Sequence, residues 1–98
     1  MDLVQFRQSL SDDEPSPDLS EAQQALWWHA KGDWSHAHDC AQKNDDAPSA
    51  LVHGFLHRVE GDLDNARYWY TRAGRKLPNG SIEDEWDALS EELLSQQV

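Results

Sequence analysis

The stretch that decides the fold is residues 50–73, ALVHGFLHRVEGDLDNARYWYTRA, which has the pattern of two short helices joined by a tight turn. In its first half, apolar side chains recur at the spacing of one helix face; they are Leu51, Val52, Phe55, Leu56 and Val59. Gly61 is suited to the left-handed conformation that ends a helix, and Asp62 can cap the next helix. The small residues Gly54 and Ala66 allow two helix axes to approach closely. The stretch therefore predicts an antiparallel helical hairpin.

A similar hairpin is indicated earlier in the chain, where Gly32 and Asp33 occupy the same places as Gly61 and Asp62. Its first helix has an N-terminal capping pattern formed by Asp18 and Glu21. Its second helix starts at Trp34, is capped by Asp33, and ends where residues 44–48 break the pattern. The sequence thus predicts two hairpins in succession.

A further helix is predicted after the turn at residues 78–80, because Ser81 and Asp84 form another capping pattern. Its apolar stripe is made of Ile82, Trp86, Leu89 and Leu93. The hairpin helix of residues 50–59 has an apolar face that is more often covered than left bare, and this last helix is the candidate to cover it. At the other end, residues 2–10 are predicted to form a short helix that either docks on the body or remains frayed, and that is loosely attached through the acidic, proline-containing residues 11–18.

The second hairpin resembles the tetratricopeptide repeat, on the evidence of Gly54, the Gly-Asp turn, Ala66, Tyr70, Ala73 and Pro78. The first hairpin matches more loosely, at Ala25, Trp28, Gly32, Ala37 and Ala41. The resemblance covers residues 18–78, and the same stretch is also similar to short uncharacterised bacterial proteins. The resemblance implies a superhelical stack of helices whose concave face usually holds a peptide or another protein.

The expected fold is therefore all-α: two antiparallel helical hairpins in a tetratricopeptide-like stack, plus a C-terminal capping helix. We expect residues 1–17 to form the N-terminal helix and linker, and residues 18–98 to form a single domain. The chain of 98 residues is long enough for one modest core. A chain of this length predicts one compact domain and is too short for a catalytic domain together with a regulatory one.

Composition excludes several classes of partner. The chain has 8 Lys and Arg against 19 Asp and Glu, a net charge of −11 that argues against nucleic acid and anionic membranes as general partners. Cys40 is the single cysteine, so no internal disulfide is expected and a reducing compartment is favoured. No run of apolar residues reaches the ~20 that a membrane-spanning helix needs, and no signal-peptide pattern is present. A cytoplasmic protein is the resulting prediction.

Basic and aromatic side chains gather in residues 58–76, which contain five of the eight basic residues. This cluster predicts a surface that binds a protein or an acidic peptide, or that mediates self-association. The predicted contact residues are Arg58, Arg67, Tyr68, Trp69, Arg72 and Arg75. The alternative is that these arginines pair with the protein's own carboxylates, as mixed surface charges commonly do.

A metal site is the alternative function. His53 and His57 are one helical turn apart and Glu60 follows on the same side, so the three can converge on a divalent ion, with His29 as an additional candidate. The glutamate that follows the first histidine in the zinc-protease pattern is missing, and packing histidines are the competing interpretation. His36 and Cys40 form a second pair at helical spacing, beside His38, for metal binding or thiolate chemistry. No catalytic residue and no organic cofactor is predicted.

Overall fold

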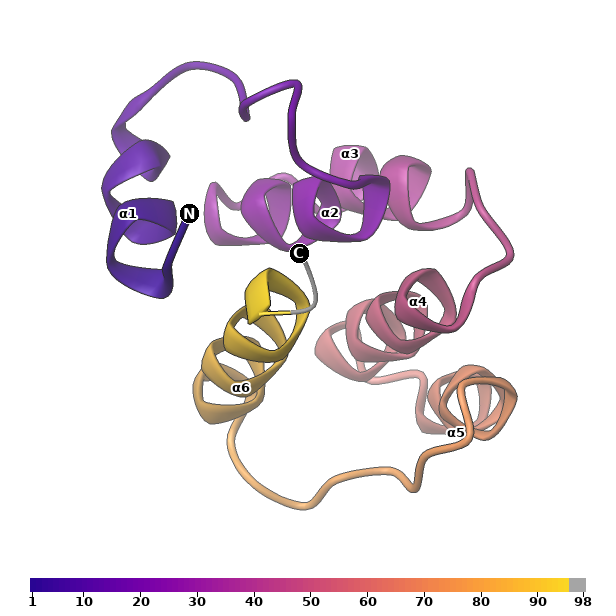
Figure 1. Ribbon diagram of the computed structural model, residues 1–98. Coiled ribbons are helices and arrows are strands. Elements are labelled where there is room, and N and C mark those ends of the chain that lie inside the picture. The colour runs from indigo at the N-terminus through magenta and orange to yellow at the C-terminus, as the bar shows by residue number, and fades with distance from the viewer. Residues whose placement is uncertain (96–98) are drawn as a thin grey trace.

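The computed structural model describes residues 1–95, and all its regular elements are helical. In chain order they are α1 (Leu3–Gln8), the 3-10 turn η1 (Ser9–Ser11), α2 (Glu21–Ala30), α3 (Trp34–Ala41), α4 (Ala47–Val59), α5 (Leu63–Arg72) and α6 (Ile82–Ser95). The predicted all-α class is confirmed. Helix α2 packs against α3 and α4 packs against α5, and α4 also contacts α2 and α3 (Figure 1). Helical pairs therefore stack side by side, while the antiparallel order and the tetratricopeptide likeness stay predictions.

The two Gly-Asp turns have the predicted conformation. Gly61 has a φ of +86°, and the amide N–H of Asp62 donates to the carbonyl of His57 at 2.9 Å. The Asp62 carboxylate then accepts from the amide of Asn65 and caps α5. Gly32 has a φ of +83° and Asp33 caps α3 in the same way. Only glycine adopts this conformation without strain, which explains why a glycine ends both helices.

Two helix starts differ from the sequence prediction. Helix α2 is capped by Ser20 and not by Asp18, because the Ser20 hydroxyl accepts from the Gln23 amide while the Gln23 side chain accepts from the Ser20 amide. Helix α4 begins at Ala47, so Pro48 lies inside its first turn. Proline is tolerated there because the first amides of a helix have no partner within the helix. The predicted break at residues 44–48 was therefore too long.

Helices α4 and α5 lie close together at Gly54. A Cβ atom at this position would lie 2.9 Å from Tyr70 Cδ2 and 3.2 Å from the Ala66 carbonyl oxygen. Both contacts are shorter than side chains normally make, so only a glycine fits without movement. The predicted close approach at Gly54 and Ala66 is confirmed.

Helix α6 covers the core, as predicted. It packs against α2 and α4 (Figure 1). Of its predicted apolar stripe, Trp86, Leu89 and Leu93 are buried and Ile82 is partly buried. Trp86 Nε1 donates to the Leu26 carbonyl at 2.9 Å, so the indole is also anchored by a hydrogen bond. Apolar burial and a satisfied polar group together fix this helix on the stack.

A buried ion pair ties α6 to the second hairpin. Arg58 Nη1 lies 2.7 Å from Glu85 Oε1, and the two side chains are only 12% and 8% exposed. The Tyr70 hydroxyl donates to the other oxygen of Glu85, and the Arg58 guanidinium also donates to the Gly80 carbonyl. Each charged group is therefore satisfied by several partners, as burial requires.

Helix α1 docks on the core rather than hanging from a loose linker. The Phe6 ring is 1% exposed and stacks on Trp86 with ring centroids 5.8 Å apart. Ser9 Oγ accepts from Trp27 Nε1 at 3.1 Å, which joins η1 to α2. The sequence pattern could not show this attachment, because a helix of six residues depends on its tertiary contacts for stability.

The lengths and apolar content of the helices also bear on membrane association. Within residues 1–95, no helix combines the length and the hydropathy that crossing a bilayer requires.

Candidate metal centre

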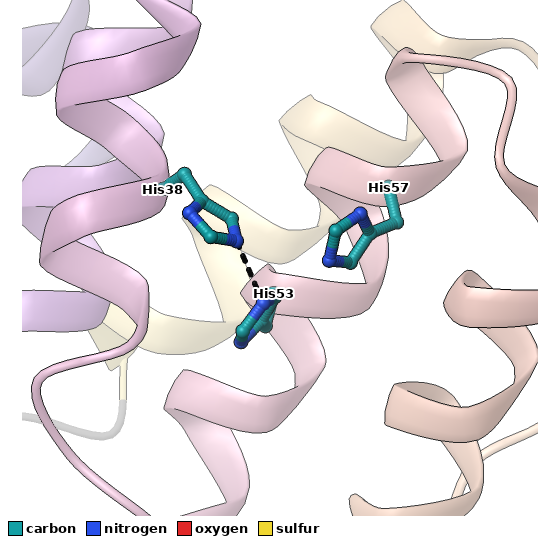
Figure 2. A group of neighbouring side chains, drawn as sticks. All are labelled: His38, His53 and His57. Carbon is teal, nitrogen blue, oxygen red and sulfur yellow. Dashed lines mark hydrogen bonds between the residues drawn. The ribbon is translucent and has the colours of Figure 1, made fainter.

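Three histidine side chains from two helices meet between α3 and α4. His38 projects from α3, and His53 and His57 project from successive turns of α4, so that the rings point toward one another (Figure 2). One ring nitrogen from each residue lies within 4.8 Å of the others. His38 Nε2 and His53 Nε2 are 2.9 Å apart and share a hydrogen bond. We call His38, His53 and His57 the histidine cluster.

The predicted metal set of His53, His57 and Glu60 is only partly brought together in the cluster. His53 and His57 are neighbours, but the carboxylate of Glu60 is hydrogen-bonded to His57 Nδ1 at 2.6 Å and lies behind that ring. A bond to Nδ1 fixes the tautomer of an imidazole and makes Nε2 the nitrogen that carries the lone pair. Glu60 thus orients His57 in the histidine cluster.

His38 was missed as a partner of His53. The sequence placed it beside His36 and Cys40 on its own helix, whereas its ring faces the next hairpin. The signal that could have found it is the repeat itself, because the second helix of one hairpin contacts the first helix of the next in a stack. Such a contact joins residues of α3 to residues of α4.

The other predicted ligands lie outside the histidine cluster. The His29 ring packs edge-on against Phe55 at 5.0 Å, and the His36 ring stacks on Trp28 at 3.8 Å. Cys40 is buried, and burial raises the pKa of its thiol. A protonated, enclosed thiol is a poor nucleophile and a poor metal ligand.

A second group of donors, formed by His57, Glu60 and Asp62, also has atoms within 4.8 Å of one another. It shares His57 with the histidine cluster, and its two carboxylates are exposed at the α4–α5 turn. Asp62 is already engaged as the cap of α5. Exposed carboxylates at a turn are ordinary surface groups, so the histidine cluster is the stronger candidate.

Two tryptophans hold the imidazoles in place. The Trp34 ring stacks on His38 at 4.8 Å, and the Trp69 ring stacks on His53 at 4.0 Å. Trp34 Nε1 donates to the Leu56 carbonyl at 2.8 Å, which fixes that indole against α4. Stacked and hydrogen-bonded neighbours restrict ring rotation, and a restricted ligand loses less entropy when it binds an ion.

Burial disfavours the charged form of two imidazoles of the cluster, His38 and His53. The pKa of His53 is lowered to about 4, mainly by burial and in smaller part by the neighbouring His38 and His57. Burial also lowers the pKa of His38, with an additional contribution from His57. Neutral imidazole is the form that binds metal ions, so the lowered pKa values of His38 and His53 favour metal binding at pH 7.

The residues of the predicted contact surface differ in their exposure to solvent. Arg58 is buried in its ion pair with Glu85, and Arg75 pairs with Glu92 at 2.5 Å. Trp69 is partly buried against His53. The contact residues that remain exposed are Arg67, Tyr68, Arg72 and Arg75, although Arg67 also pairs with Asp64 at 3.0 Å.

Comparisons of the chain with known proteins gave no match. A scan against protein-family models, a search of curated proteins and a search of solved structures each found none.

Proposed function

We propose that this protein binds a divalent transition-metal ion, of which Zn²⁺ is the representative, through His38, His53 and His57. The observation that supports this function is the convergence of three imidazole nitrogens from two helices within 4.8 Å. Imidazole is a common ligand of zinc, copper, nickel and iron, whereas calcium and magnesium prefer oxygen. The composition of the cluster therefore favours a transition metal.

One nitrogen pair of the cluster already has nearly the separation that a bound ion requires. A tetrahedral zinc ion with Zn–N bonds of about 2.0–2.1 Å places two ligand nitrogens about 3.3 Å apart. The His38–His53 nitrogens, at 2.9 Å, would separate by roughly 0.4 Å as the ion replaces their hydrogen bond. Glu60 on His57 Nδ1 supplies the outer carboxylate that metal-bound histidines commonly have.

Metal uptake by untagged protein tests the proposal. The chain is dialysed against Zn²⁺, and the bound metal is measured by elemental analysis and native mass spectrometry. One equivalent is expected in the wild type, and His38→Ala and His53→Ala should each lose at least about tenfold in affinity. His36→Ala is the matched control, because His36 lies on the same helix but outside the cluster and should leave uptake unchanged. Equal uptake by His38→Ala and His36→Ala, with both folded by circular dichroism, would overturn the proposal.

A second candidate is binding of an acidic peptide, or self-association, at Arg67, Tyr68 and Arg72. The observation that favours it is the exposed Tyr68 ring, 54% accessible, with the Arg72 guanidinium 5.9 Å from its centroid. A tetratricopeptide-like scaffold in the cytoplasm is the setting in which we place such a surface. Titration with a glutamate-rich peptide, and sedimentation of the protein alone, are the assays. Arg67→Glu with Arg72→Glu should abolish either response, and a response that survives both changes contradicts this candidate.

A further inference from the structure

We infer that the metal held by the histidine cluster keeps one coordination position open, and that this position exchanges water for a small monodentate anion beside Asn65. The inference rests on the metal function proposed above and deepens it by naming a class of ligand. It follows from the number of donors, the exposure of the cluster and the position of one amide.

The donor count leaves the coordination incomplete. The nitrogens of His38, His53 and His57 lie within 4.8 Å of one another. Within residues 1–95, no further His, Cys, Asp or Glu has a ligand atom within this distance of all three. The nearest carboxylate of the arrangement, that of Glu60, is engaged with His57 Nδ1. Structural zinc sites usually have four protein ligands, whereas sites with three histidines carry water or another small ligand in the fourth position. Three neutral imidazoles leave the ion with its full charge, which favours an anion.

Solvent can reach the cluster from the side of α3. His53 and His57 are each 6% exposed, whereas His38 is half-buried. A small ligand would therefore enter beside His38 and would not have to pass through the core. Zinc with an exchangeable ligand is also the arrangement of hydrolytic zinc sites, so simple esters are the first substrates to assay.

Asn65 lies where it can contact such a ligand. Its Nδ2 atom is 3.3 Å from His57 Nε2, the nitrogen that remains after Glu60 has taken Nδ1. A metal ion would occupy the lone pair of that nitrogen, and the amide of Asn65 would then lose its acceptor. The amide would turn aside to make room for the ion, and its N–H group would then lie within reach of an anion in the fourth position. We therefore assign Asn65 as the donor that favours an anion over water.

Cobalt-substituted protein tests the inference, with azide as the probe. Uptake of Co²⁺ is followed by its visible absorption, and azide is then titrated in. The expected result is a saturable spectral change, with azide affinity lowered about 2- to 10-fold in Asn65→Leu through the loss of one hydrogen bond. Asn44→Leu is the control, because Asn44 is an exposed asparagine on the α3–α4 connection.

The outcomes separate the two levels of the proposal. Failure to take up Co²⁺ overturns the metal function itself. Uptake of Co²⁺ without any response to azide leaves the metal function standing and overturns the open position. Loss of Co²⁺ from Asn65→Leu would make Asn65 a fourth ligand, which also overturns the open position. An unchanged azide affinity in Asn65→Leu contradicts the assigned role of its amide.

Discussion

Replacing Glu85 by alanine should destabilise the protein strongly, because it leaves the Arg58 charge buried without its carboxylate. The two side chains are 12% and 8% exposed and lie 2.7 Å apart. Removing one member of a buried ion pair costs about 3–5 kcal/mol. Arg58 retains the Gly80 carbonyl as an acceptor, so we expect the lower part of that range, about 3 kcal/mol. Urea denaturation followed by tryptophan fluorescence measures the change in the free energy of unfolding.

Two further variants make this measurement decisive. Asp87→Ala removes the exposed pair with Arg7, whose side chains are 50% and 43% accessible, and should cost less than about 1 kcal/mol. Arg58→Met combined with Glu85→Leu replaces the buried pair by apolar groups and should recover most of the lost stability. A loss in Glu85→Ala no larger than that in Asp87→Ala would refute the reasoning. Such a result would also mean that Arg58 is not held by a buried ion pair and can belong to the predicted contact surface.

Three other perturbations give measurable outcomes in the same assay. Gly54→Ala should destabilise by about 1–3 kcal/mol, despite the better helix propensity of alanine, because its Cβ would press on the Tyr70 ring; equal stability would contradict the close packing. Phe6→Ala should lower the free energy of unfolding by about 3 kcal/mol, whereas Val4→Ala on the exposed side of α1 should leave it almost unchanged. Equal effects of the two changes would show that α1 is not docked. For metal-free protein, the free energy of unfolding should fall by about 1–2 kcal/mol between pH 7 and pH 5. The reason is that the His53 pKa is lowered from 6.5 to about 4, so the unfolded chain takes up a proton that the folded chain does not. A free energy of unfolding that does not change with pH would argue against a buried neutral ring.

The fold was largely predictable because its signals are local. Helix stripes, the Gly-Asp turns at Gly32 and Gly61, and the capping serine of α6 are each encoded within a few neighbouring residues. Helix starts were less certain, since Ser20 and Asp18 are both good capping residues and only the chain path decides between them. Docking of α1 depends on the contact of Phe6 with Trp86, and no local pattern contains that information.

The candidate site was predictable only in part, for the same reason. His53 and His57 lie on one helix, so their spacing alone placed them together. His38 belongs to another hairpin, and its approach to His53 depends on how the hairpins stack. The arginines showed the opposite error: their closeness in sequence suggested one surface, but Arg58 turns inward to a carboxylate that lies 27 residues further along the chain. Charge composition cannot tell which partner a long side chain will reach.

The position of α6 has a consequence for the order in which the protein can fold during synthesis. Phe6 of α1 stacks on Trp86, and the same indole is anchored on Leu26 of α2. Both early helices therefore depend on a segment that the ribosome makes after all the other described helices, at about 5–20 residues per second. Until α6 has emerged, the apolar side chains that this helix will cover are exposed to solvent in the nascent chain. Chaperone engagement of nascent chains should therefore end when α6 leaves the exit tunnel.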